Sequence, residues 1–245
     1  RRSADLLESL MQGGAKLMLL CSPHNPGGRV WTREELERVG ELCLKYGVKV
    51  VSDEIHCDLV FAEYRHVPFA SMSEALAGIT ITCAAPSKTF NIPGLATAYT
   101  IIPNVAIRKQ FSERIKAQAI GSLNFFGPTA TIAAYTQSEE WLDAVLIYIR
   151  ANRDFAVAYL AEHLPAVVPV LSEGTYLLWV DCRALGWKKA EMKQVMYKEA
   201  KIAFTEGSIY GQNGEGFLRI NLACPRSLLE EALERFCTAV AAHQA

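Results

Sequence analysis

Residues 16–35, KLMLLCSPHNPGGRVWTREE, predict the unit of secondary structure from which the fold is built. The first six residues form a short apolar run, which is typical of a buried strand. Two prolines, an asparagine and two glycines follow and predict a turn-rich loop. Thr32 and Glu35 then have the spacing of a capping box, which predicts a helix that ends near Gly47. The stretch therefore predicts a strand, a loop and a helix in succession.

The same unit repeats along the first half of the chain. A second buried strand is expected over Val48–Ser52, a helix after Ser71-x-x-Glu74 and a third strand over Gly78–Cys83. This repetition predicts a parallel sheet covered by helices on both faces. The link over residues 84–95 is too irregular for a crossover helix, so residues 96–102 are expected to return antiparallel in the same sheet.

Three helices are expected after this sheet. Asn104 is predicted to cap a helix to about Gly121, and a short helix is expected after Phe126-Gly-Pro128. The third opens at Ser138 and is unusually long, reaching about Leu164, which suits a bridge between two domains.

The pattern changes beyond Pro165 to a compact α+β unit. Its expected elements are strands over 167–171 and 176–181, a helix over 188–201, a strand over 217–223 and a final helix capped at Ser227-x-x-Glu230. We therefore predict an α/β chain with a mostly parallel large domain over 1–140 and a smaller C-terminal α+β domain over 141–245.

Composition excludes several classes of function. The chain has 245 residues, of which 51% are hydrophobic and 21% charged, and its net charge is -1, so no basic surface for nucleic acid or anionic membrane is expected. No apolar run approaches the roughly 18 residues of a membrane span, which favours a cytoplasmic protein. The seven cysteines are scattered without a C-x-x-C pair, so we interpret them as reduced core thiols and expect no metal site.

Polar side chains follow each of the three parallel strands. They are Asn25, the group Asp53, Glu54 and His56, and the run Ser87-Lys88-Thr89. Ligands bind at the carboxyl ends of strands in open parallel sheets, so these side chains are expected to converge. Each also has a structural interpretation, because asparagine, aspartate and histidine are ordinary loop and cap residues. A metal site that adds Asp58 is disfavoured, since alternation along an extended chain divides the ligands between two faces.

Two phosphate-binding loops are excluded by their context. The glycines of a P-loop are missing before Lys88, and Gly211-x-x-Gly-x-Gly216 does not lead from a strand into a helix. A lysine, an aspartate and an asparagine around one pocket instead fit pyridoxal 5'-phosphate. Lysine forms a Schiff base with the cofactor aldehyde, an acid keeps the pyridine nitrogen protonated, and an amide donates to the ring oxygen.

Four motifs resemble those of fold-type I pyridoxal-phosphate enzymes, the aminotransferase class I/II superfamily. They occur in the family's order and spacing over 22–29 (SPHNPGGR), 52–56 (SDEIH), 85–95 (APSKTFNIPGL) and 217–221 (FLRIN). Within that superfamily the chain most resembles the carbon–sulfur lyase branch, the cystathionine β-lyases of the MalY and PatB type. The resemblance covers essentially the whole chain and implies the type I fold.

The resemblance also implies roles for single residues. Lys88 is the Schiff-base lysine, Asp53 the partner of the pyridine nitrogen, Asn25 the ligand of the ring oxygen and Ser87 a phosphate ligand. Arg219 binds the substrate carboxylate, a role that suits the planar guanidinium.

Three positions depart from the aminotransferase pattern. His56 replaces a tyrosine that donates to the cofactor ring oxygen, and Ala96 replaces an arginine on the cofactor phosphate; both choices resemble the lyase branch. Ala85 lacks a hydroxyl often found three residues before the lysine. Phosphate binding is then expected to depend more on hydroxyls and backbone amides.

The resemblance implies that enzymes of this branch begin well before a segment like Arg1. The chain is therefore expected to be the rear part of a longer protein, to bind cofactor poorly by itself and to be inactive unless completed. For the complete protein, which is expected to be a homodimer, β-elimination from cystathionine or another S-substituted cysteine is predicted. An aminotransferase is the first alternative, and a non-catalytic regulatory protein that keeps the fold is the second.

Overall fold

The computed structural model describes residues 2–244. Arg1 and Ala245, the outer ends of the two predicted domains, lie outside the described residues. The chain divides into two compact units: the first runs to Pro23 and resumes over Val30–Leu142, and the second comprises His24–Arg29 and the chain from Asp143 onward. The short segment His24–Arg29 thus belongs to the second unit although both of its flanks belong to the first.

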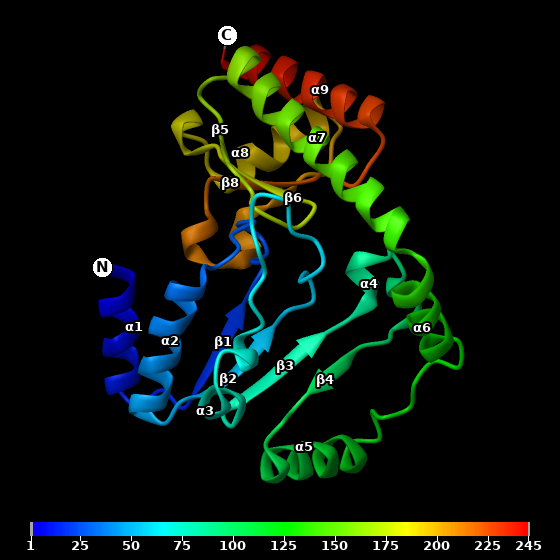
Figure 1. The fold of residues 1–245 in the computed structure, drawn as a ribbon. Helices are drawn as coiled ribbons and strands as arrows, with labels where there is room; N and C mark the ends of the chain where they lie inside the picture. Colours follow the sequence, from blue (N-terminus) through cyan, green and yellow to red (C-terminus); the bar gives the residue numbers. More distant parts are fainter. Residues whose placement is uncertain (1, 245) are drawn as a thin grey trace. The chain divides into compact units, whose positions relative to one another are not determined.

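The first unit is built on a four-stranded sheet. Its strands, β1 (Leu17–Cys21), β2 (Lys49–Asp53), β3 (Thr80–Ala84) and β4 (Tyr99–Ile101), lie in the order of the sequence (Figure 1). β1, β2 and β3 pair in parallel, and β4 returns antiparallel to β3. The predicted strands, their parallel pairing and the antiparallel return are confirmed.

One face of this sheet carries the core of the first unit. α1 (Arg2–Gln12) and α2 (Arg33–Tyr46) pack against it, and Leu20 and Val50 are buried there at 6% and 0% exposure. On the opposite face Leu17 and Leu19 are 55% and 77% exposed. Within residues 2–244, the predicted cover of both faces is therefore missing over β1, whereas Val51 and Ile81 on the same face of β2 and β3 are half-buried.

Two short helices follow the second and third strands. α3 (Glu74–Ala77) is capped by Ser73, whose hydroxyl accepts from the backbone N–H of Leu76. The helix lies where the sequence predicts it, and the Ser71 hydroxyl donates to the carbonyl of Pro68 in a preceding turn. α4 (Pro86–Thr89) is a single turn directly after β3.

Three further helices close the first unit and lead into the second. Asn104 caps α5 (Val105–Ala117) as predicted, although the helix ends four residues before Gly121. α6 (Gly127–Gln137) and the long α7 (Glu139–His163) follow where the sequence predicts them.

The second unit contains an antiparallel sheet in the order β5-β6-β8-β7. Its strands are β5 (Val168–Val170), β6 (Leu177–Asp181), β7 (Thr205–Glu206) and β8 (Phe217–Asn221). The two-residue β7 was not predicted, because its sequence has no strand-length apolar run.

Two longer helical segments accompany this sheet. α8 (Lys189–Gln194) continues into a π-helical turn over Val195–Glu199, and α9 is Arg226–Gln244. The predicted cap at Ser227 is wrong, since the helix already begins at Arg226 and Ser227 lies within its first turn. Single 3₁₀ turns complete the fold at Phe69–Ser71, Pro93–Leu95, Arg183–Leu185, Gly207–Tyr210 and Gln212–Gly214.

All seven cysteines are free thiols. Cys43 and Cys182 are buried and the other five are half-buried, so the interpretation as core thiols holds fully for two of them. Burial raises the pKa of Cys43 to about 11 and, together with nearby carboxylates, that of Cys57 to about 12. These two thiols therefore stay protonated and poorly reactive near neutral pH. Among residues 2–244, no helix combines the length and apolar character needed to span a membrane.

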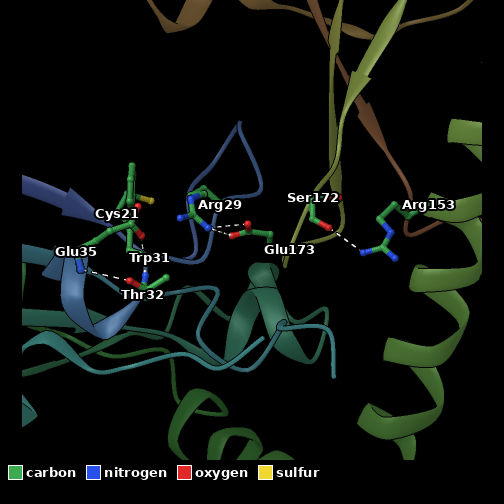
Figure 2. A network of polar contacts seen from close by, with 8 residues as sticks. All are labelled: Cys21, Arg29, Trp31, Thr32, Glu35, Arg153, Ser172 and Glu173. Carbon is green, nitrogen blue, oxygen red and sulfur yellow. Dashed lines mark hydrogen bonds and ion pairs between the residues drawn. The ribbon is translucent and has the colours of Figure 1, made fainter. Parts of the chain in front are cut away.

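The capping box of α2 gives a direct test of the sequence-derived fold. Thr32 Oγ1 accepts from Glu35 N at 3.3 Å, and Glu35 Oε2 accepts from Thr32 N at 2.8 Å (Figure 2). Thr32→Ala removes the first bond and is expected to lower the free energy of unfolding by about 1 kcal/mol. Urea denaturation measures this loss, and Thr32→Ser, which keeps the hydroxyl, should retain most of the stability. Equal losses in both variants would contradict the capping role.

Candidate active site

The carboxyl ends of three strands meet at one edge of the first sheet. Cys21 pairs with Asp53 in the β1–β2 register, and Glu54 N donates to Cys83 O at 2.9 Å. Asp53 closes β2, and its Oδ1 accepts from Ile55 N at 3.2 Å. Within the part of the chain that the structure describes, Asp53 Oδ2 has no hydrogen-bond partner. This carboxylate can therefore accept a proton donor from a ligand.

Lys88 lies on the single turn α4, which begins two residues after β3 ends. Its side chain is half-buried, and its amine makes no hydrogen bond or ion pair with any described residue. Ser87 precedes it, and the Ser87 carbonyl accepts from Ile92 N at 3.2 Å. An amine without a carboxylate partner is available for reaction with an aldehyde once it loses its proton.

His56 lies in the turn after β2 and is 2% exposed. Its carbonyl accepts from Leu59 N at 2.9 Å, which tightens this turn. Four predicted site residues therefore lie at the ends of two neighbouring strands. They are Asp53 at the end of β2, His56 in the turn after it, and Ser87 and Lys88 on the turn after β3.

The Glu54 carboxylate binds groups in the protein interior, and Glu54 is not one of the predicted cofactor or substrate ligands. Its Oε1 accepts from Ser52 Oγ at 2.8 Å and from Phe69 N at 3.1 Å, and its Oε2 lies 2.9 Å from His66 Nε2. The carboxylate is 4% exposed, and these three partners satisfy it. Among residues 2–244, no group of three or more acidic, histidine or cysteine side chains could hold a metal ion.

The other two predicted residues contact each other in the second unit. Arg219 on β8 donates from Nη1 to Asn25 Oδ1 at 2.9 Å, although the two residues are 194 positions apart. A guanidinium can only donate, so this bond fixes the amide with Oδ1 toward Arg219 and leaves the two Nδ2 protons as donors. Thr205 Oγ1 at 3.5 Å and the Tyr210 ring, 5.3 Å from the guanidinium carbon, also neighbour Arg219. Convergence of all six predicted residues stays a prediction.

The loop that carries Asn25 is held by contacts that the sequence does not reveal. Arg29 Nη1 lies 2.6 Å from both carboxylate oxygens of Glu173 (Figure 2). The backbone N–H groups of Glu173 and Gly174 donate to Gly28 O at 2.8 and 3.1 Å. Gly28 has a φ of +69°, and its backbone approaches Ser172 so closely that an added Cβ would lie 2.4 Å from the Ser172 Cβ.

A buried arginine supports the partner segment of this loop. Arg153 on α7 is 6% exposed and donates from Nη1 to Ser172 O at 2.8 Å (Figure 2). Its Nε donates to Asp154 Oδ1 at 2.8 Å. The sequence reasoning missed Arg29, Arg153 and Glu173. Arg29 and Glu173 are 144 positions apart, and Arg153 reaches a backbone carbonyl 19 positions away, so neither contact leaves a local pattern. At the base of the loop, Trp31 Nε1 donates to Cys21 O at 2.9 Å (Figure 2).

Two more residues near Lys88 were not predicted to contact each other beside it. Asp58, considered only as a metal ligand, accepts at Oδ2 from Thr89 Oγ1 at 2.8 Å. Thr89 follows Lys88 in the motif over 85–95, and this position was the only feature of the sequence that could have indicated its role.

Similarity to known proteins shows the family to which the chain belongs. Residues 3–236 match the family described as aminotransferase class I and II. The chain is 45% identical over 236 residues to the cystathionine beta-lyase PatB of Bacillus subtilis and 39% identical over 232 residues to the protein MalY of Escherichia coli. These alignments cover 96% and 93% of the chain but 61% and 58% of the two relatives.

The fold of the chain is also similar to that of a solved structure. Cystalysin from Treponema denticola, which contains pyridoxal 5'-phosphate, superposes with a TM-score of 0.96 at 40% identity, covering 98% of this chain and 61% of that one. The chain belongs to the aminotransferase class I and II family and has its α/β fold. It spans about three fifths of the length of the curated relatives that it matches.

The close approach at Gly28 predicts a specific loss in the second unit. Gly28→Ala forces a side chain into the left-handed region and against Ser172, so a loss of about 2–4 kcal/mol in the free energy of unfolding is expected. Gly186→Ala is the matched control, because Gly186 has a similar φ of +72° but nothing within 4 Å of the added Cβ. Denaturation and amide hydrogen exchange over 24–29 measure the difference. Equal losses in the two variants would contradict the packing argument.

Proposed function

We propose that the protein is a pyridoxal 5'-phosphate-dependent carbon–sulfur β-lyase. The reaction is β-elimination from cystathionine or a related S-substituted cysteine, which consumes one water and yields a thiol, pyruvate and ammonia. The observation that carries this proposal is the ranking of the curated relatives: the one named cystathionine beta-lyase PatB is 45% identical to the chain, whereas the curated relatives named aminotransferase are 27% identical. A solved structure named as a “putative aminotransferase” is 43% identical, which keeps the aminotransferase as the alternative.

The residues present fit the cofactor. Lys88 supplies an amine without an ionic partner, Asp53 supplies a carboxylate oxygen for the ring nitrogen, and Asn25 supplies Nδ2 protons for the ring oxygen. Ser87 is proposed as a phosphate ligand, and His56 as a cofactor neighbour. We assign residues 1–140 to the cofactor-binding domain and residues 141–245 to the small domain, with α7 as the helix that joins them.

Bound pyridoxal phosphate supplies an electron sink for the charge that develops at the substrate Cα. Lys88 Nζ removes the Cα proton as general base, and a thiolate leaves from Cβ. Asp53 holds a proton at the ring nitrogen, which favours charge delocalisation. Arg219 binds the α-carboxylate and thereby orients the Cα–H bond for removal.

The amino-acid substrate is the small molecule that this set of residues recognises. Assembly as a homodimer and a cytoplasmic location stay predictions. An aminotransferase remains the alternative within the family, because it uses the same lysine, aspartate and arginine and differs in the fate of the substrate.

Product analysis of the purified full-length protein tests the proposed reaction. Incubation with cystathionine is expected to release pyruvate and a thiol, and Lys88→Ala should abolish this release by removing the general base. Borohydride reduction in the presence of the cofactor should leave a pyridoxyl group on the peptide that contains Lys88. A new amino acid formed from an amino acid and 2-oxoglutarate, without pyruvate from cystathionine, would show an aminotransferase instead. If the unaltered protein turns over neither substrate and Lys88→Ala leaves amino-acid binding unchanged, the protein is non-catalytic.

The role of Arg219 gives a second test. Arg219→Lys keeps the charge but loses the forked donor geometry and the bond to Asn25, so kcat/KM for cystathionine should fall by about 10- to 100-fold. Arg235→Lys is the matched control, because Arg235 pairs with Glu231 on the exposed surface of α9. The loss should appear mainly as a higher KM. Equal kinetics for the two variants would contradict carboxylate binding at position 219.

A further inference from the structure

The helical turn that carries Lys88 is too short to be stable by itself. α4 has four residues, Pro86–Thr89, and its N-cap residue Ala85 makes no side-chain hydrogen bond. Helix nucleation is unfavourable, and an isolated turn gains too few backbone bonds to offset the loss of chain entropy. The position of Lys88 must therefore be fixed by contacts with other parts of the first unit.

Asp58 supplies the polar contact of this kind. Its Oδ2 accepts from Thr89 Oγ1 at 2.8 Å, and Thr89 is 2% exposed. A buried hydroxyl that donates to a carboxylate makes one of the stronger hydrogen bonds found in proteins. Asp58 lies on the segment after β2, five residues beyond Asp53, so the bond joins the loop of the proposed acid to the turn of the lysine.

A tyrosine pair supports the same carboxylate. Tyr135 on α6 donates to Asp58 Oδ2 at 3.4 Å, and its hydroxyl lies 3.3 Å from that of Tyr99. Burial, followed by the hydrogen bond with Tyr99, raises the pKa of Tyr135, so this hydroxyl keeps its proton. Because Tyr135 has one proton and gives it to Asp58, Tyr99 is the donor in the tyrosine pair.

Aromatic packing holds the other end of the turn. The ring of Phe90, the residue after Thr89, packs edge-on against Tyr135 with 5.1 Å between centroids and lies 6.2 Å from Trp141. Phe90 and Asp58 therefore both contact Tyr135, and Lys88 lies on a turn with fixed neighbours on its C-terminal side.

We propose that Asp58 is a positioning residue for Lys88, acting through the hydroxyl of Thr89. Its carboxylate fixes the turn so that the amine is presented at the edge of the sheet where Asp53 lies. The catalytic importance of this arrangement rests on the proposed function, whereas the fixing of the turn does not depend on any cofactor.

Four variants test the proposal. Thr89→Val keeps the side-chain shape but removes the donor, Asp58→Ala removes the acceptor, and Thr89→Ser keeps the hydroxyl. Thr80→Val is the matched control, since Thr80 is also buried and its hydroxyl donates to Leu76 O at 2.7 Å, at the opposite end of β3.

Amide hydrogen exchange over residues 85–92 of the purified, cofactor-free protein is the first readout. Thr89→Val and Asp58→Ala should raise exchange there by about tenfold, as expected for loss of one charge-assisted hydrogen bond. Thr89→Ser should restore the slow exchange, and Thr80→Val should leave it unchanged. Exchange in Thr89→Val equal to that of the unaltered protein, or equal to that of Thr80→Val, would overturn the proposal.

The second readout, made on the full-length protein, is the fraction of Lys88 that pyridoxal phosphate and borohydride convert to pyridoxyl-lysine at limiting cofactor. It should fall by about tenfold in Thr89→Val and Asp58→Ala and recover in Thr89→Ser. Full labelling in Thr89→Val would overturn the positioning role. If the unaltered protein is not labelled at Lys88, the proposed function fails, and the exchange measurement still decides whether Asp58 fixes the turn.

Discussion

Parallel pairing of β1, β2 and β3 is the constraint on which the rest of the first unit depends. Parallel strands end at the same edge of a sheet, so the register that pairs Cys21 with Asp53 also fixes where the following segments begin. Asp53 ends β2, the segment after β2 carries His56, and the segment after β3 carries Lys88. A shift of one residue in β2 would exchange Asp53 with Glu54, and the core would lose the carboxylate that binds Ser52, His66 and the Phe69 amide.

The second unit depends on a hydrogen bond of long range. Arg219 and Asn25 are joined at 2.9 Å across 194 residues, and a six-residue segment bounded by residues of the first unit belongs to the second. This placement requires a glycine at position 28, where the backbone meets Ser172, and it is reinforced by Arg29 and Glu173. The hydrogen bond also fixes the orientation of the Asn25 amide. A guanidinium accepts no hydrogen bond, so only Oδ1 of the amide can be its partner.

Short elements around the lysine obtain their order from side chains rather than from helix propensity. α4 is one turn long, and the contacts that hold it come from Asp58, Tyr135 and the ring of Phe90. Such an arrangement places the Lys88 amine on a turn held by side-chain contacts, and the amine has no ionic partner among residues 2–244. If Lys88 binds an aldehyde cofactor as proposed, both features suit that role.

The sequence by itself determined the strands, the long helices and the chemistry of single residues, because apolar periodicity and capping residues act over a few neighbouring positions. The capping box at Thr32, the cap at Asn104 and the start of α7 after Ser138 were predicted from such local patterns. A similar local pattern at Ser227 gave a wrong cap, since the helix already begins at Arg226. The attachment of residues 24–29 to the second unit, the partners of Arg29 and Arg153, and the bond between Asp58 and Thr89 were decided only by the tertiary structure. Those contacts join positions far apart in the chain, and their energy exists only after the chain has packed.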